Sequence, residues 1–151
     1  MESGFVMNIR LYLPMDHAEW LRMLGGLYPE TSADEHTADM EAWLLRPDTG
    51  VLVAERDGGG LAGFAEVGER NYADGCDTAP VAYLESWYVD PDVRQQGVGA
   101  ALVRAVEEWA CGRGYRELAS DALLENITSQ RAHLQIGFEE VERSVKYRKS
   151  L

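Results

Sequence analysis

The segment 89–100, which reads VDPDVRQQGVGA, constrains the fold more than any other part of this 151-residue chain. It joins a stretch typical of a strand to one whose apolar residues recur at helical spacing. Free backbone N–H groups and the dipole at the start of such a helix favour an anion. Gly97 and Gly99 lack Cβ atoms, so the main chain can approach that anion closely, and Arg94 adds a positive charge. The spacing matches neither GxxxxGK[ST] nor GxGxxG, which excludes a Walker loop and a full dinucleotide fingerprint.

Apolar periodicity along the chain predicts one domain, 1–151, of the α+β class. The predicted strands are 8–13, 51–56, 61–69, 79–89, 116–120 and 138–147, and the predicted helices begin at Pro14, near Ser32, at Val98 and at Asn126. In chain order this is β-α-α-β-β-β-α-β-α-β, which indicates a mixed central sheet flanked by helices. Ser32 is expected to cap the second helix with Glu35 three residues on, and the glycines of 57–60 to form a hairpin turn.

The charge balance limits the class of partner. Lys and Arg number 14 against 26 Asp and Glu, a formal net charge of −12. Affinity for nucleic acid comes largely from basic residues that neutralise phosphates, so we expect no nucleic-acid partner. An acidic surface is compatible with a cationic ligand, although many proteins are acidic for solubility alone.

Other classes of protein are excluded by what the sequence lacks. No apolar run approaches the ~20 residues that a membrane-spanning helix needs, so no membrane association is expected. Cys76 and Cys111 are isolated, and the three histidines (His17, His36 and His133) lack zinc-site spacing, so we expect no metal. The first residues do not read as a signal peptide, which predicts a cytoplasmic location; Met7 is an alternative first residue, with 1–6 as an extension.

The pattern V-x-P-x-x-R-x-x-G-x-G in residues 89–99, between a strand and a helix, resembles the acetyl-CoA pyrophosphate loop of the GNAT superfamily of N-acetyltransferases. Residues 7–30, 71–89 and 117–149 are similar to aminoglycoside 6'-N-acetyltransferases, which modify antibiotics in bacteria. The resemblance implies a GNAT-type fold, acetyl-CoA as cosubstrate, an aminoglycoside as acceptor, antibiotic resistance and a homodimer, in some relatives with exchanged C-terminal strands.

The resemblance also implies which residues bind acetyl-CoA. Asn126 matches the residue that bonds the pantetheine arm, and Ser129 follows one turn later. Four residues before Gly137 the superfamily often has a tyrosine that protonates the departing thiolate; here it is His133, so the acid is His133, the distant Tyr147, or none. The full predicted set is Tyr88, Val89, Arg94, Gln95, Gln96, Gly97, Val98, Gly99, Asn126, Ser129 and His133.

An acceptor with several ammonium groups needs carboxylates at its site. Glu85 precedes Trp87-Tyr88-Val89 on the strand that leads into the turn, and Asp121 follows the next strand. The predicted acceptor-binding residues are Trp20, Tyr28, Tyr72, Asp77, Glu85 and Asp121. Two of them have a plainer interpretation: Trp20 has helical-core spacing, and Asp77 is compatible with a solvated carboxylate.

The expected chemistry is direct transfer in a ternary complex, because neither cysteine has a histidine partner that would make it a nucleophile. Asp121 is the predicted proton acceptor and Glu85 the residue that orients the amine, with a backbone N–H near Tyr88 and Val89 facing the carbonyl oxygen. Two alternatives stay open: an acetyltransferase for another small amine or a peptide N-terminus, and a non-catalytic acyl-CoA-binding module.

Overall fold

The computed structural model describes residues 8–151, so the predicted extension 1–6 lies outside the described part. The strands are β1 (Asn8–Leu11), β2 (Gly50–Glu55), β3 (Leu61–Arg70), β4 (Val81–Val89) and β5 (Leu118–Ser120), and the helices are α1 (His17–Leu27), α2 (Ala33–Leu45), α3 (Val98–Gly112) and α4 (Ile127–Gln135). Short 3-10 turns at Pro14–Asp16 and Pro91–Val93 precede α1 and α3. The predicted α+β class and the predicted order of elements are confirmed as far as α4.

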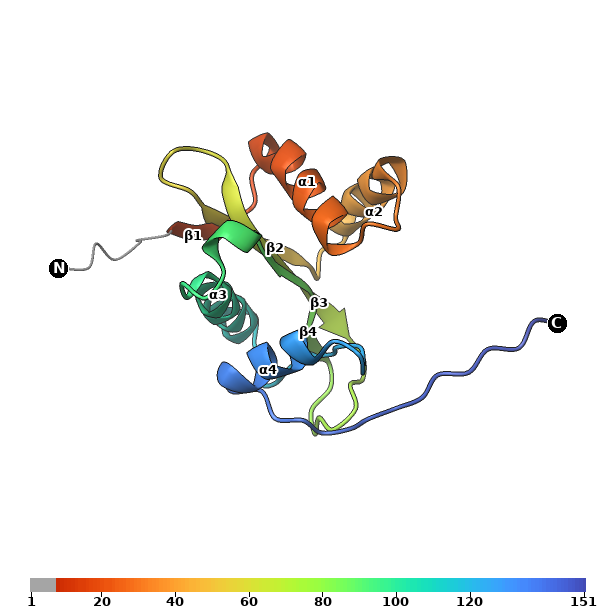
Figure 1. The fold of residues 1–151 in the computed structure, drawn as a ribbon. Helices are drawn as coiled ribbons and strands as arrows, with labels where there is room; N and C mark the ends of the chain where they lie inside the picture. Colours follow the sequence, from red (N-terminus) through yellow and green to blue (C-terminus); the bar gives the residue numbers. More distant parts are fainter. Residues whose placement is uncertain (1–7) are drawn as a thin grey trace.

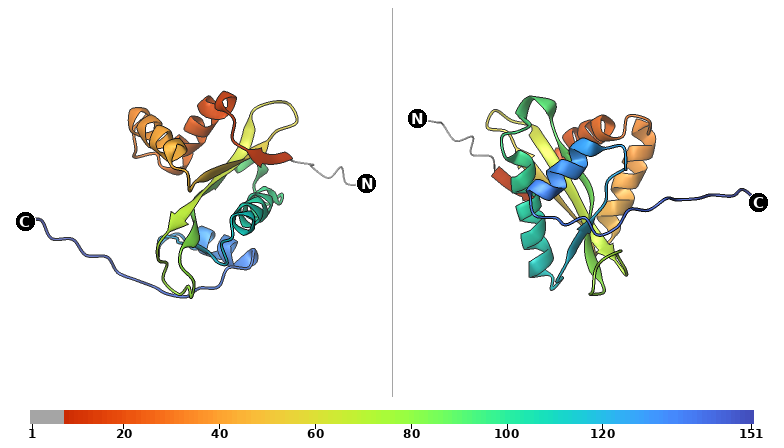
Figure 2. Two further views of the ribbon diagram at one scale, coloured as in Figure 1. Left: turned by 180° about the vertical axis from the view of Figure 1, so that it is seen from behind. Right: turned by 60° about the horizontal axis from the view of Figure 1, so that its bottom comes forward.

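The sheet is mixed, and its strands lie in chain order. Neighbours from β1 to β4 are antiparallel, and β5 is parallel to β4. A parallel neighbour requires a crossover, which α3 provides. In Figures 1 and 2, α1 and α2 cover one face of the sheet, and α3 and α4 lie on the other.

Alternation along β2 explains why both faces are covered. Val51 and Val53 pack with Trp20 of α1, whereas Leu52 and Ala54 pack with the apolar stripe of α3. Successive side chains of a strand point to opposite faces, so an almost fully apolar strand needs helices on both sides. These two cores fix the position of the strand–turn–helix unit that β4 and α3 form.

The second helix begins as the sequence predicts. The Ser32 hydroxyl accepts a hydrogen bond from the Glu35 backbone N–H at 3.1 Å, which satisfies one free donor of the first turn of α2. No helix within residues 8–151 is long and apolar enough to cross a membrane.

The predicted last strand, 138–147, is wrong for the single chain. Residues 138–151 contain no strand and leave the body as an extended segment (Figure 1). A strand exists only where a neighbour completes its ladder of hydrogen bonds, and alternating residues alone do not supply that neighbour. Val141, Val145 and Tyr147 are consequently exposed, Tyr147 by 92%.

Candidate active site

A bulge in β4 opens the sheet beside β5. Glu66 of β3 pairs with Ser86, but the next residue, Val67, pairs with Leu84, so Glu85 is the extra residue. β5 pairs only with Ala82–Leu84. The strands therefore separate from Glu85 onward, and the β5 side of β4 is left without a strand partner among residues 8–151. A bulge that ends pairing in this way frees backbone N–H groups for a ligand.

The turn after β4 has the backbone of an anion site. Gln95 and Gly97 have positive φ values, 63° and 84°. Left-handed residues in a tight turn can aim successive N–H groups into one concavity. Helix α3 starts at Val98 with no side-chain cap and no acidic residue in its first turn, so its first N–H groups stay free for an anion. The turn therefore fits a pyrophosphate.

Gly99 serves packing as well. The indole N–H of Trp87 donates to the Gly99 carbonyl oxygen at 3.1 Å, and a Cβ at Gly99 would lie 3.0 Å from the Trp87 ring. The absence of a side chain thus lets α3 approach β4 closely. Arg94 folds back over the end of the strand, where its Nε donates to the Val89 carbonyl oxygen at 2.9 Å.

The base of the turn is held by an ion cluster that the sequence analysis missed. Asp90 is buried and accepts two hydrogen bonds from Arg22, at 3.0 and 2.9 Å, and one from Arg56 at 2.9 Å. Burial alone would raise the pKa of Asp90, but the two guanidinium groups hold it below its ordinary value. Arg22 comes from α1 and Arg56 follows β2, so spacing along the chain gives no sign of this cluster.

The two predicted carboxylates, Glu85 and Asp121, are linked beside the opening through Arg70 and Tyr83. Arg70, at the end of β3, donates two hydrogen bonds to Glu85, at 3.0 and 2.7 Å. The same guanidinium lies 3.5 Å from the centre of the Tyr83 ring. Tyr83 in turn donates to Asp121 at 2.5 Å, just beyond the end of β5. Burial and the Asp121 carboxylate raise the pKa of Tyr83, so the phenol keeps its proton.

Comparison with known proteins agrees with this geometry. Residues 17–138 match the Acetyltransferase (GNAT) family. This chain belongs to the GNAT acetyltransferase family. Its curated relatives include the aminoglycoside N(6')-acetyltransferases type 1 of Klebsiella aerogenes, 46% identical over 90% of this chain and 91% of the relative, and of Serratia marcescens, 42% identical over 87% and 91%. The chain is therefore an acyltransferase, similar to these aminoglycoside N(6')-acetyltransferases.

Solved structures give the same result for the fold. A structure of the aminoglycoside N-acetyltransferase AAC(6')-Iy in complex with CoA has a TM-score of 0.92 and 38% identity, covering 100% of this chain and 99% of its own. A second AAC(6')-Iy structure, with the bisubstrate analogue CoA-S-monomethyl-acetylneamine, has a TM-score of 0.90 and 39% identity over 96% and 99%. The GNAT-type fold is thereby confirmed, and acetyl-CoA is the cosubstrate of the family.

A second set of polar side chains lies beside the carboxylates Glu85 and Asp121 of this GNAT enzyme. Tyr28, at the end of α1, shares a hydrogen bond of 2.9 Å with Ser86. Glu66, opposite Ser86, accepts from the Trp20 indole N–H at 3.1 Å, and burial raises the pKa of Glu66 to about 7. The signal for Glu66 was a single acid within the apolar run LAGFAEV of β3.

The structure corrects the prediction that Trp20 binds the acceptor. Its side chain has 0% exposure, so no face of the indole is free to meet a sugar ring. The plainer interpretation, core packing, describes its position. Tyr28, by contrast, is partly exposed beside Ser86, within reach of the opening.

Two further predicted acceptor residues lie in the loop before β4, away from the pyrophosphate turn that follows it. The Asp77 backbone N–H donates to the Glu117 carboxylate at 2.8 Å. Tyr72 is 69% exposed. The single chain does not bring either residue together with Glu85 and Asp121.

Helix α4 closes the other side of the opening. Asn126 caps it, accepting from the Ser129 N–H at 3.1 Å, which leaves the Asn126 amide NH2 as a donor. His133 Nδ1 donates to the Ser129 carbonyl oxygen at 2.7 Å, and Nε2 lies 2.8 Å from the Ser120 hydroxyl. The ring stands edge-on to Trp87. Both nitrogens of His133 thus have protein partners, and the residue joins α4 to β5.

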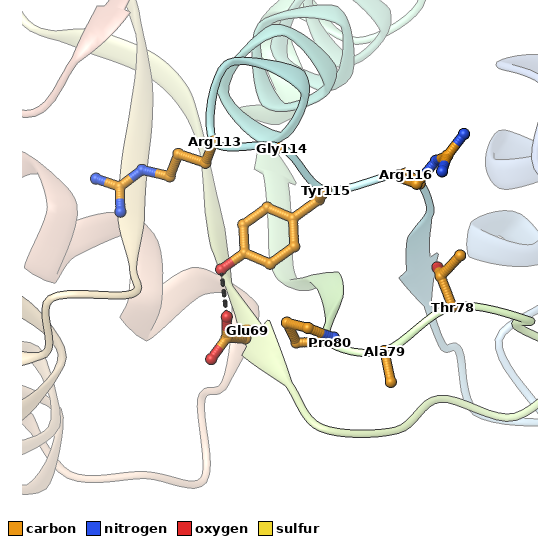
Figure 3. Close-up of a pocket in the computed structure, with 8 residues that line it drawn as sticks. All are labelled: Glu69, Thr78, Ala79, Pro80, Arg113, Gly114, Tyr115 and Arg116. Carbon is orange, nitrogen blue, oxygen red and sulfur yellow. Dashed lines mark hydrogen bonds between the residues drawn. The ribbon is translucent and has the colours of Figure 1, made fainter.

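A separate pocket lies at the opposite end of β4 (Figure 3). Tyr115 crosses it and donates to Glu69 at 2.7 Å. Burial, together with this hydrogen bond, raises the pKa of Tyr115 to about 12. None of the predicted site residues lines this pocket. Within residues 8–151, no cluster of three or more His, Cys, Asp or Glu could hold a metal ion.

Proposed function

We propose that this enzyme, as one domain, transfers the acetyl group of acetyl-CoA to the 6'-amine of aminoglycosides in a ternary complex in the cytoplasm, and so confers resistance to them. The observation that carries the proposal is the chain of contacts from Glu85 through Arg70 and Tyr83 to Asp121, at the point where β4 leaves β5. Relatives at 46% and 42% identity are named for this activity.

The first chemical requirement is a neutral amine, and the carboxylates Glu85 and Asp121 help to provide it. An amine with a pKa near that of lysine, ~10.4, costs about 5 kcal/mol to deprotonate at pH 7. Asp121 accepts that proton, directly or through water, while Glu85 orients the amine-bearing ring. Placement of the amine against the thioester supplies a further part of the rate.

The free edge of β4 answers the second requirement. A backbone N–H near Tyr88 and Val89 faces the carbonyl oxygen as negative charge develops there. The predicted residues of the turn and of α4, from Arg94 to Gly99 with Asn126 and Ser129, bind the cosubstrate. The turn holds the pyrophosphate by its backbone N–H groups.

We also propose that the departing sulfur leaves without an acid from residues 8–151. His133 uses both nitrogens internally, and Tyr147 lies in the extended C-terminal segment. A thiol of pKa about 8.5 costs only about 2 kcal/mol to leave as thiolate at pH 7, so transfer does not depend on a protein acid. His133 then acts by holding α4 against β5.

We also propose a homodimer in which residues 138–151 pair with a second copy. An extended segment with exposed apolar side chains at Val141, Val145 and Tyr147 supports this, because such a strand is stable only when its backbone groups are paired.

The test is acetyl-CoA turnover with kanamycin, tobramycin and amikacin, followed by mass and position analysis of the product. Glu85→Gln and Asp121→Asn should each lower kcat/KM for the acceptor by about 10- to 100-fold, since a hydrogen bond to a charged group contributes about 1.5–3 kcal/mol. The KM for acetyl-CoA should stay unchanged. Glu41→Gln, an exposed acid of α2, is the control.

The alternatives give different outcomes. Acetylation of simple amines or peptide N-termini in preference to aminoglycosides would indicate another acceptor class. Tight CoA binding without transfer to any amine would indicate a non-catalytic module. Acetylation at a position other than the 6'-amine would contradict the proposed regiochemistry.

A further inference from the structure

Arg70 lies between the residues of the proposed acceptor site. Its guanidinium makes two hydrogen bonds to Glu85 and lies against the Tyr83 ring, whose hydroxyl bonds Asp121. A carboxylate, an aromatic face and a second carboxylate are the groups that would receive a ligand ammonium. The enzyme thus supplies an internal cation where a cationic acceptor has to bind.

The exposure of this pair decides whether it can be exchanged. The side chains of Arg70 and Glu85 are 45% and 26% exposed. Ion pairs this accessible to water contribute only about 0–1 kcal/mol, because water and salt screen them. Arg70 is therefore held in place, but weakly enough for another cation to replace it.

The number of charges on the acceptor then matters. One ammonium group that replaces Arg70 at Glu85 exchanges one ion pair for another and gains little. An acceptor with several ammonium groups makes further contacts with the carboxylates of the site, Asp121 among them, and so has a net gain.

We propose that the Arg70 guanidinium competes with the acceptor for Glu85, so that an acceptor has to replace Arg70 there and one that carries a single ammonium group gains little by binding. This inference rests on the proposed function, because it assumes that acceptor amines bind at Glu85. It assigns a role to a residue that sequence reasoning gave none.

The experiment compares Arg70→Gln with wild type, using tobramycin as the polycation and 6-amino-6-deoxy-D-glucose as the monocation. Arg70→Gln should lower the KM for both acceptors about 3- to 10-fold, because each of them replaces the same guanidinium at Glu85. Arg46→Gln is the matched control, because Arg46 is also paired with an acid and stacked on an aromatic ring, but its hydrogen bonds go to Asp48 rather than to Glu85.

A double-mutant cycle separates competition from a structural role. In a Glu85→Gln background, Arg70→Gln should leave both KM values unchanged, because the competed carboxylate is gone. A raised or unchanged KM for the monocation in Arg70→Gln alone overturns the inference, since Arg70 would then support Glu85 rather than compete for it. Wild type that neither binds tobramycin by calorimetry nor acetylates it overturns the proposed function, and the inference with it.

Discussion

Glu66, Glu85 and Asp121 are three carboxylates around one opening, and each has a different partner. Glu85 is paired with a guanidinium, Asp121 accepts from a phenol, and Glu66 is enclosed beside an indole N–H. Burial distinguishes Glu66 from the other two, because it disfavours the charged form of a carboxyl group. Burial raises the pKa of Glu66 to about 7, so this carboxyl group is partly protonated at neutral pH.

The first prediction concerns how the ionisation of Glu66 lowers the stability of the folded protein. Because its pKa is raised in the folded state, the folded protein binds more protons than the unfolded chain between about pH 4.5 and pH 7. Stability therefore falls as pH rises through this range, by up to about 3 kcal/mol from 1.36 kcal/mol per pKa unit. Glu66→Gln removes this titration. The free energy of unfolding, measured with urea at about pH 5 and pH 8, should therefore fall less with rising pH in the variant than in wild type.

Glu41→Gln is the control for this measurement, since Glu41 is exposed on α2. It should follow wild type at both pH values. Equal pH dependence in wild type and Glu66→Gln would show that Glu66 does not titrate in this range.

Glu85 and Asp121 could be predicted because the family resemblance points to them, and because Glu85 lies on a predicted strand and Asp121 directly follows one. Glu66, Arg70 and Tyr83 could not, since their roles depend on strand register. Glu66 faces Ser86, and Arg70 reaches Glu85, only because the bulge shifts the pairing of β3 with β4 by one residue. A one-residue shift reverses which face a side chain occupies, and local periodicity does not contain it.

At the scale of elements, the strand–turn–helix unit of β4 and α3 is the best predicted part of the molecule. Its backbone shows why glycine is needed at residue 97, where φ is 84° and no atom would meet a Cβ. A side chain there is disfavoured by backbone conformation alone, at about 1–2 kcal/mol.

Gly97→Ala is therefore expected to lower the free energy of unfolding by about 1 kcal/mol and to raise the KM for acetyl-CoA several-fold, because the strained turn moves its N–H groups. The KM for the acceptor should change little. Gly58→Ala, at a hairpin position with open space and no positive φ, is the control and should leave both constants unchanged. An unchanged acetyl-CoA KM in Gly97→Ala would contradict the assignment of the turn.

At the scale of the whole molecule, the segment 138–151 shows what periodicity cannot supply. The apolar residues Val141, Val145 and Tyr147 lie on one face of an extended chain, with polar residues between them, which predicts a strand; yet the single chain has no neighbour for it among residues 8–151. The exposed apolar side chains and the unpaired backbone of this segment support the proposed pairing with a second copy.

The last prediction is that the protein is a dimer whose association depends on this segment. Burying Val141, Val145 and Tyr147 against a second copy contributes about 2 kcal/mol each. Deletion of 139–151, or Val141→Glu with Val145→Glu, should give a monomer by light scattering. Glu142→Gln with Lys146→Gln, on the alternate face of the segment, should stay a dimer. If the protein without these changes is a monomer, the proposed dimer is wrong. If a dimer survives the deletion, its interface does not depend on this segment.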